Sequence, residues 1–230
     1  MYIRIYQINT SRDQNRQKFH GFAALGGQPV DASIYDEVFA GELFPKEGQN
    51  SIDPEEIYRR FNTEGHPLHR GHSLSISDVV ELEDRFYFCD SVGFREIDFN
   101  PTLTQKQDNL MRVVYVEPGR PPYVAEIEQT LKGEQKAVGG LIEPIYYADG
   151  ICLVGNEEAK LIGMAGNRRL DGIGIIAGPF FVCGLTETGD EFRSLTDEEA
   201  GYYMEHFAEP EEISQEEVEA DTGFMIYGMY

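Results

Sequence analysis

Hydrophobic and polar positions alternate along much of this chain, which is the pattern of β-strands. Residues 2–8 read YIRIYQI, where isoleucines alternate with tyrosine and arginine, so they predict a strand whose two faces differ. Residues 73–82 and 85–99 continue in the same way on either side of Glu83 and Asp84, which predicts further strands joined by a turn. The first hundred residues therefore supply the strands of a first sheet.

Two short helices are predicted between these strands. Residues 33–41 (SIYDEVFAG) end at Gly41, a residue that suits the C-terminus of a helix. A second helix is expected to begin at Asp53, which can cap it. Pro54 suits the first turn, and the two glutamates that follow meet the positive end of the helix dipole. This helix is expected to stop near Gly65.

The second half of the chain repeats the mixture of strands and short helices. Strands are predicted over residues 112–117, 123–128, 141–147, 151–155 and 173–185, and a helix over residues 129–140. The last of these strands is expected to be long, buried and bent at Gly178 and Pro179. Thr196 and Glu199 have the spacing of a capping box, and the apolar residues that follow recur with helical spacing, which predicts a further helix.

The pattern divides the chain into two modules. Residues 100–110 are polar and lack periodicity, so we expect a linker there, and the alternation resumes after it. We expect an α+β fold of two small modules, residues 1–99 and 111–208, each a mostly antiparallel sheet with a few short helices. Residues 209–230 form an acidic tail with an apolar end.

The tail has two interpretations. Ser214 and Glu217 have the spacing of a helix cap, and the last seven residues, FMIYGMY, are apolar and aromatic. One interpretation is a docked last strand or a frayed end. The other is a short linear peptide that anchors in a groove of a partner or adds to a sheet edge, with Phe224 and Tyr227 as candidate interaction residues.

Charge changes the functional picture more than any motif. The chain has 19 basic and 41 acidic residues, a net charge of −22. Such a surface repels phosphate backbones and favours a basic or nucleic-acid-handling protein as partner, so we expect no direct binding of DNA or RNA. No stretch approaches the ~20 apolar residues that span a bilayer, and the N-terminus lacks an apolar secretion signal, so we expect no membrane association.

The cysteines indicate the compartment. Three are present, an odd number with no C-x-x-C pair. This usage favours reduced and mostly buried thiols in a cytoplasm over a disulfide framework or a structural zinc site. We expect no metal and no cofactor.

Residues 66–78 contain three histidines and three serines. The histidines recur every three residues, but a proline and a glycine between them prevent a helix, so we expect a solvated loop. The serines alternate in SLSISD and line one face of the predicted strand, and nothing in the sequence supplies an oriented base to activate them. We take Asp78, and Asp90 and Phe94 near the next turn, as candidate interaction residues.

One group of polar residues suits a bound ligand. Its members are Asn156, Glu157, Lys160, Asn167 and Arg168, on either side of the small-residue string LIGMAG. Amide, ammonium and guanidinium groups together suit a carboxylate, a phosphate or the edge of a nucleobase. The alternative is that these residues cap and hold a loop.

Several longer strings resemble known families. YQINTSRDQNRQKF, SIYDEVFAG, RGHSLSISDVV and YFCDSVGF make residues 1–99 resemble the YodL-like domain, which occurs in proteins of conjugative transposons and phages of Gram-positive bacteria. VEPGRPPYVAEIEQTL, AVGGLIEPIY, IIAGPFFVCG and SLTDEEAGYYMEHF make residues 111–208 similar to a second uncharacterised family of mobile-element proteins. The resemblance implies a mobile genetic element in a bacterial cytoplasm and two compact α+β modules, and it implies no reaction.

Two functional hypotheses follow. The first is a non-enzymatic accessory protein of a bacterial mobile genetic element that binds a host or element protein. One form of it is an acidic mimic of nucleic acid that acts against restriction or another host defence. The alternative is a module in residues 111–208 that binds or sequesters a small, nucleotide-like ligand. We identify no catalytic residues, since no phosphate-binding loop, dinucleotide motif or zinc-protease motif is present. An enzyme with an unrecognised site is the third possibility.

Overall fold

The computed structural model describes residues 1–226 except residues 47, 50 and 107. It divides the chain into two compact units, an N-terminal unit of residues 1–108 and a C-terminal unit of residues 109–230. Each unit contains an antiparallel sheet and a few short helices. This arrangement confirms the predicted α+β fold of two small modules.

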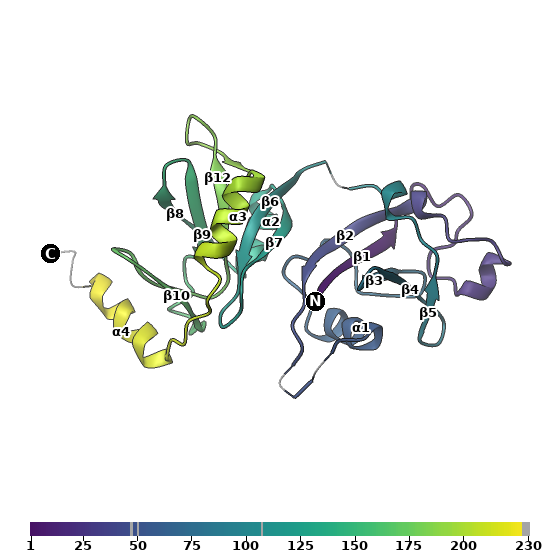
Figure 1. The fold of residues 1–230 in the computed structure, drawn as a ribbon, viewed down its shortest axis with the longest axis horizontal. Coiled ribbons are helices and arrows are strands. Elements are labelled where there is room, and N and C mark those ends of the chain that lie inside the picture. The colour runs from purple at the N-terminus through teal and green to yellow at the C-terminus, as the bar shows by residue number, and fades with distance from the viewer. Residues whose placement is uncertain (47, 50, 107, 227–230) are drawn as a thin grey trace. The chain divides into compact units, whose positions relative to one another are not determined.

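The N-terminal unit is built on a five-stranded antiparallel sheet with the strand order β2-β1-β3-β4-β5 (Figure 1). The strands are β1 (Tyr2–Ile8), β2 (Tyr35–Glu42), β3 (Val79–Leu82), β4 (Arg85–Cys89) and β5 (Phe94–Ile97). The described part of this unit also contains the α-helix α1 (Pro54–Thr63) and the short 3-10 helices η1 (Phe22–Leu25), η2 (Ala32–Ile34) and η3 (Pro101–Leu103).

Helix α1 begins where the sequence predicts. The carboxylate of Asp53 accepts a hydrogen bond from the backbone N–H of Glu56 at 2.8 Å, which satisfies one free donor of the first turn. The helix then packs an apolar face on the sheet, where the ring of Phe61 meets the ring of Phe39 in β2 edge-on, with 5.0 Å between centroids. Local capping sets where α1 starts, and this aromatic contact fixes it against the sheet.

The predicted turn at Glu83 and Asp84 joins β3 to β4. Both residues have positive φ, 52° and 59°. Leu82 pairs with Arg85, so the connection contains two residues. Positive φ at both central residues is the conformation of a hairpin turn whose twist matches that of the flanking strands.

The prediction of a helix over residues 33–41 is wrong, because Tyr35–Glu42 form β2. This strand pairs with β1 along its whole length. Its valine and aromatic residues suit a strand, and Gly41, which suggested a helix end, lies inside the ladder opposite Ile3. Residues 73–78 also form no strand, and turns lead from there into β3.

The C-terminal unit is built on a larger antiparallel sheet with the strand order β7-β6-β12-β9-β8, and the short β13 pairs with β12. A separate hairpin is formed by β10 and β11. The strands are β6 (Leu110–Val116), β7 (Tyr123–Glu128), β8 (Ile142–Ala148), β9 (Ile151–Asn156), β10 (Gly166–Leu170), β11 (Gly174–Ala177), β12 (Phe180–Leu185) and β13 (Phe192–Arg193). The helices are α2 (Leu131–Val138), α3 (Asp197–His206) and α4 (Gln215–Ile226).

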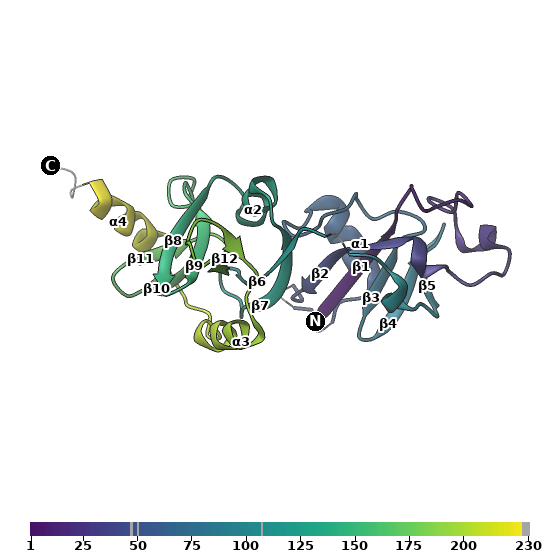
Figure 2. The same ribbon diagram turned by 90° about the horizontal axis from the view of Figure 1, so that it is seen from above.

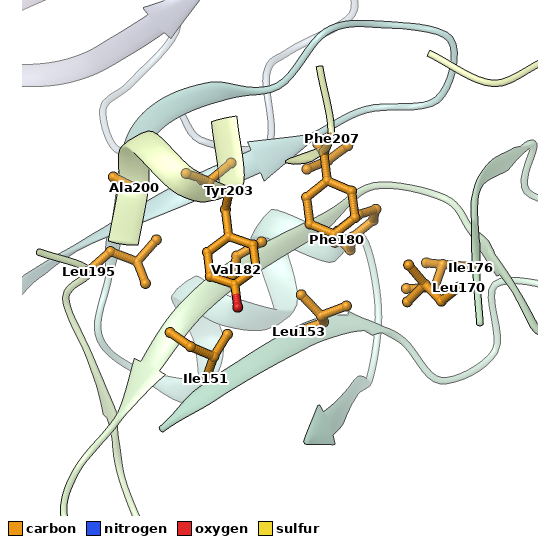
Figure 3. Packing of buried hydrophobic residues seen from close by; sticks show 12 residues of the cluster. Ile151, Leu153, Leu170, Ile176, Phe180, Val182, Leu195, Ala200, Tyr203 and Phe207 are labelled. Atoms are coloured by element: carbon orange, nitrogen blue, oxygen red, sulfur yellow. The ribbon is translucent and has the colours of Figure 1, made fainter. Parts of the chain in front are cut away.

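Helices α2 and α3 cover opposite faces of the larger sheet (Figure 2). Side chains alternate along β6, so neighbouring residues face different helices. The hydroxyl of Tyr115 donates to the carbonyl of Ala137 in α2 at 2.6 Å, whereas Val114 belongs to the core under α3. In that core, Tyr203 and Phe207 lie over the strands (Figure 3).

The predicted helix ends in this unit are confirmed. Thr196 and Glu199 form a complete capping box at the start of α3, in which each side chain accepts from the backbone N–H of the other residue. Gly139 follows α2 in the left-handed conformation with φ 75° and lets its N–H bond back to the carbonyl of Gln135.

The prediction of one long strand over residues 173–185 is wrong. The chain turns at Gly178, whose φ is +71°, and Pro179 follows. The apolar run is therefore divided between β11 in the hairpin and β12 in the centre of the larger sheet. Both halves are hydrophobic, so their composition does not reveal that they enter different sheets.

The predicted linker and tail take more structure than expected. Residues 101–105 belong to the N-terminal unit, where Gln105 accepts from the N–H of Glu37 at 3.0 Å. In the tail, Ser214 and Glu217 cap α4 reciprocally, as their spacing predicts. The interpretation of a docked last strand is wrong for the described residues, since they form a helix that packs through Val218.

Candidate binding groove of the C-terminal unit

A groove of about 340 Å³ lies on the face of the larger sheet that α3 covers, between β8 and β11. We call it the β8–β11 groove. Most of its lining is apolar and comes from three segments that are distant in the sequence. The principal apolar lining residues are Ile145, Ala159, Leu161, Ile173, Ile175 and Ile176. Three of the five candidate ligand-binding residues, Asn156, Glu157 and Lys160, also line it.

Asn156 lines the groove and shapes the loop that follows β9. Its amide donates to the carbonyl of Val138 at 3.3 Å, and its oxygen accepts from the N–H of Glu158 at 2.8 Å. A side chain at Gly140 would lie 2.4 Å from the Asn156 amide, so glycine is required there. Since Asn156 is buried and bonded through both its amide nitrogen and its oxygen, it holds the loop.

Lys160 is bonded to the tail. Its ammonium donates to Asp221 in α4 at 2.6 Å, and the same carboxylate oxygen accepts from the N–H of Ile175 in β11 at 3.0 Å. Burial raises the pKa of Asp221, but the bonds from Lys160 and Ile175 outweigh it and the net pKa lies below the usual value. The carboxylate is therefore ionised at neutral pH and neutralises the lysine.

The rim of the groove is acidic. The carboxylates of Glu143 and Glu157 are exposed and form no ion pair within the part of the chain that the structure describes. Because Lys160 is already neutralised by Asp221, the unpaired charge at the groove is negative. A positively charged group is the natural neighbour for this rim.

Asn167 and Arg168 lie in the interior and do not line the groove, which corrects their grouping with Asn156 and Lys160. Asn167 donates to the carbonyls of Val116 and Gly178 at 3.0 and 2.8 Å. Burial lowers the pKa of Arg168. These two residues connect β10 to its surroundings. The alternative interpretation, that they hold the local structure together, therefore describes them better than ligand binding does.

Sequence reasoning missed the apolar lining. Ile173, Ile175 and Ile176 were assigned to one long buried strand, whereas the turn at Gly178 places them in the hairpin beside the groove. The signal available in the sequence was Leu161 and the isoleucine after it, two large apolar residues in a loop with polar ends. Leu161 is 75% exposed.

In the N-terminal unit, Asp78 lies in the interior and is not a surface interaction residue. It is 0% exposed, and its carboxylate accepts from the side chain of Gln7 at 2.9 Å and from the N–H of Ser75 at 2.8 Å. Burial raises the pKa of Asp78 to about 7, and the two hydrogen bonds oppose that rise. This network ties residues 71–78 to β1.

The residues 66–78 hold no catalytic arrangement of serine, histidine and acid. The Nδ1 atom of His72 lies 3.4 Å from the hydroxyl of Ser75 and 4.0 Å from the Asp78 carboxylate, so both would share one ring nitrogen. The expectation of a solvated loop is wrong for His66 and His69, whose rings pack on Phe61. Among the described residues, no three histidine, cysteine or acidic side chains gather to hold a metal.

Of the other candidate interaction residues, Asp90 and Phe94 are fully described by the structure and Phe224 and Tyr227 are not. Asp90 accepts from the backbone N–H groups of Phe22 and Ser91, and these bonds lower its pKa. Phe94 is half-buried in β5, with its ring edge-on to Tyr58 at 6.2 Å. Phe224 lies in α4 without a described side chain. Tyr227 lies outside the described residues.

Comparison with protein families divides the chain as the fold does. Residues 2–99 match the model of the YodL-like domain. Residues 111–208 match a domain of unknown function, DUF3846. The chain therefore joins a YodL-like domain to a DUF3846 domain, and every lining residue of the β8–β11 groove lies in the second.

Comparisons with curated proteins and with solved structures found no significant match. Of the helices that the structure describes, none combines the length and the apolar character needed to cross a bilayer.

Proposed function

We propose that the chain is a non-enzymatic protein-binding protein, and that the β8–β11 groove takes an apolar side chain from an extended, basic segment of the partner. The observation that carries the proposal is an apolar groove whose large side chains remain exposed and whose unpaired rim charges are negative. Exposed apolar surface gathered in one place and rimmed by polar groups is characteristic of interaction sites.

The exposed apolar residues support binding of a protein segment. Leu161 is 75% exposed and Ile173 is 42% exposed, and they belong to two different lining segments of the groove. Burying one aliphatic side chain between them contributes about 1.5–3 kcal/mol of binding free energy. One such contact alone gives weak binding, so a partner segment needs further contacts along the surface.

The charge supports a basic segment. Residues 111–230 contain 8 basic and 23 acidic residues, and Glu143 and Glu157 stand at the groove itself. Complementary charge raises the association rate and excludes acidic competitors. For the same reason we propose a basic or nucleic-acid-handling protein as the partner, and no direct contact with nucleic acid.

The alternative of a nucleotide-like ligand has less support. A volume of about 340 Å³ falls at the lower end of the range for ligand pockets. A phosphate needs a free cation, yet Lys160 is bonded to Asp221 and Arg168 is bonded in the interior. We place the proposed binding in the cytoplasm of a bacterium, on a mobile genetic element. That setting rests on the family resemblance and on the use of cysteine.

The test uses the full chain and peptides selected from a random displayed library. Affinities of the selected peptides are measured by fluorescence polarisation for the wild type and for Leu161→Ser and Ile173→Thr. Leu131→Ser is the matched control, since Leu131 is 59% exposed in the same unit but does not line the groove. We expect basic peptides with one large apolar residue, and about tenfold weaker binding to each groove variant.

Two results would contradict the proposal. One is that the groove variants bind the selected peptides as tightly as the wild type does. The other is a thermal shift with nucleotides at millimolar concentration that Leu161→Ser abolishes, which would favour the small-ligand alternative. Displacement of a bound partner by duplex DNA would instead support the form of the proposal that involves nucleic-acid mimicry.

A further inference from the structure

A second exposed feature lies on the same face of the C-terminal unit as the groove. Tyr147 of β8 and Tyr202 and His206 of α3 form it, and we call it the aromatic ledge. The hydroxyl of Tyr147 lies 2.8 Å from Nε2 of His206, and the rings of Tyr202 and His206 stack with 5.8 Å between centroids and 11° between planes. Tyr202 is 59% exposed, so a large aromatic ring is held in place and still faces solvent.

The ledge is surrounded by acids. Glu198 lies four residues before Tyr202 and Glu205 three residues after it, so all three side chains share one stripe of α3. Both glutamates are exposed and form no ion pair among the described residues. An aromatic face flanked by carboxylates attracts the ammonium group of lysine and the guanidinium group of arginine more strongly than it attracts any other side chain.

The backbone beside the ledge is accessible at Gly201. Gly201 lies within α3, and a Cβ atom there would meet no atom of the described residues within 4 Å outside its own helix backbone. Glycine in the interior of a helix is destabilising, and none of the described contacts requires a glycine at this position. An uncovered turn of helix next to Tyr202 lets the backbone of a bound segment approach closely.

Strand β8 connects the ledge to the groove. Glu143 and Ile145 line the groove, and Ile145 and Tyr147 pack against the same core under α3. From Glu143 to Tyr147 is four residues of strand, a rise of about 13 Å. The ring of His206 stands between Tyr147 and Tyr202, with 5.9 Å to the first centroid and 5.8 Å to the second, so Tyr202 lies further from the groove than Tyr147 does. A segment in extended conformation covers the whole distance with about four to six of its own residues.

We propose that the aromatic ledge binds an arginine or lysine of the same partner segment, about four to six residues from the apolar side chain that enters the groove. This inference rests on the proposed function and specifies the partner further. The partner motif is an extended segment with one large apolar residue and one basic residue at that spacing. The guanidinium or ammonium lies over the Tyr202 ring, between the carboxylates of Glu198 and Glu205.

The test uses synthetic nine-residue peptides of glycine, serine and threonine that contain one leucine and one arginine. The arginine is placed two, four or six residues from the leucine on either side, and a matched peptide has glutamine in its place. Binding to the full chain is followed in ¹⁵N–¹H correlation spectra, which detect millimolar affinity. We expect an arginine peptide with the four- or six-residue spacing to bind about tenfold more tightly than its glutamine counterpart, and the peptide with the two-residue spacing to show no such gain.

Variants separate the ledge from the groove. Tyr202→Ser is expected to reduce the arginine-to-glutamine affinity ratio to about one and to leave the leucine contact intact, whereas Leu161→Ser weakens both peptides. Tyr58→Ser, at a partly exposed helix tyrosine of the N-terminal unit, is the control. An unchanged ratio in Tyr202→Ser, or no dependence on spacing, overturns the ledge alone. Failure of every leucine peptide to shift the groove signals overturns the proposed function as well.

Discussion

Replacing Arg168 with methionine removes the side chain that joins distant backbone segments of the C-terminal unit. The residue is 2% exposed, and its guanidinium donates to the carbonyls of Arg120 and Phe207, both at 2.9 Å. It also donates to the carbonyl of the neighbouring Asn167 at 3.0 Å. Methionine has a similar length and fills the space, so the main change is the loss of these donors.

Two opposing terms set the size of the effect. A hydrogen bond from a charged donor contributes about 1.5–3 kcal/mol, so the bonds to Arg120 and Phe207 together contribute about 3–6 kcal/mol. Removing the guanidinium also ends its desolvation, which lowers the pKa of Arg168, and this returns on the order of 1–2 kcal/mol. We therefore expect the free energy of unfolding of this unit to fall by about 3 kcal/mol.

Hydrogen exchange with mass spectrometry measures this loss in the intact chain. A change of about 3 kcal/mol accelerates exchange of the best protected amides by about 100-fold. Peptides from the N-terminal unit are the internal reference. Arg169→Met is the matched control, because Arg169 is exposed and its guanidinium pairs with Glu211 and Glu217 at the surface, and such pairs contribute less than about 1 kcal/mol.

The reasoning is refuted by acceleration of less than about fivefold in the core strands of the C-terminal unit. It is also refuted if Arg169→Met has the larger effect. Either result would mean that the buried hydrogen bonds of Arg168 contribute nothing beyond the cost of burying its charge.

Three further predictions concern single groups. Burial raises the pKa of Asp78 to about 7 from an ordinary 3.8, so between these two values the folded N-terminal unit holds a proton that the unfolded chain releases. The stability of this unit should therefore fall as the pH rises from about 4 to 7, and Asp78→Asn should remove this pH dependence in thermal unfolding. Gly201→Ala should raise the free energy of unfolding of the C-terminal unit by about 0.5–1 kcal/mol in hydrogen exchange, because nothing obstructs the added methyl group. The thiols of Cys89, Cys152 and Cys183 are buried. A thiol reagent should therefore label them slowly in the native protein, and it should label all three rapidly in denaturant.

Each of these has a contradicting result. A wild-type stability that is flat between pH 4 and 7 would mean that Asp78 is ionised throughout. A destabilising Gly201→Ala would show that the open space beside α3 is filled by a contact. Rapid labelling of any cysteine before unfolding would show that its strand opens locally.

The helix ends and tight turns were predicted because their causes are local. Asp53, the capping box of Thr196 and Glu199, and the cap at Ser214 each act within four residues, so their hydrogen bonds are written in the sequence. The turn at Glu83 and Asp84 is local in the same sense. For such features the neighbouring residues supply the whole interaction.

Strand partners and the groove were decided only by the tertiary structure. Residues 33–41 and 173–185 have apolar patterns that suit more than one element, and pairing with β1 in one case and a turn at Gly178 in the other selected the outcome. Asn156 and Arg168 are close in sequence, yet one lies at the groove and the other in the interior. Sequence determined the two modules, their class and their charge. The site depends on contacts between distant segments, whose free energy no local pattern contains.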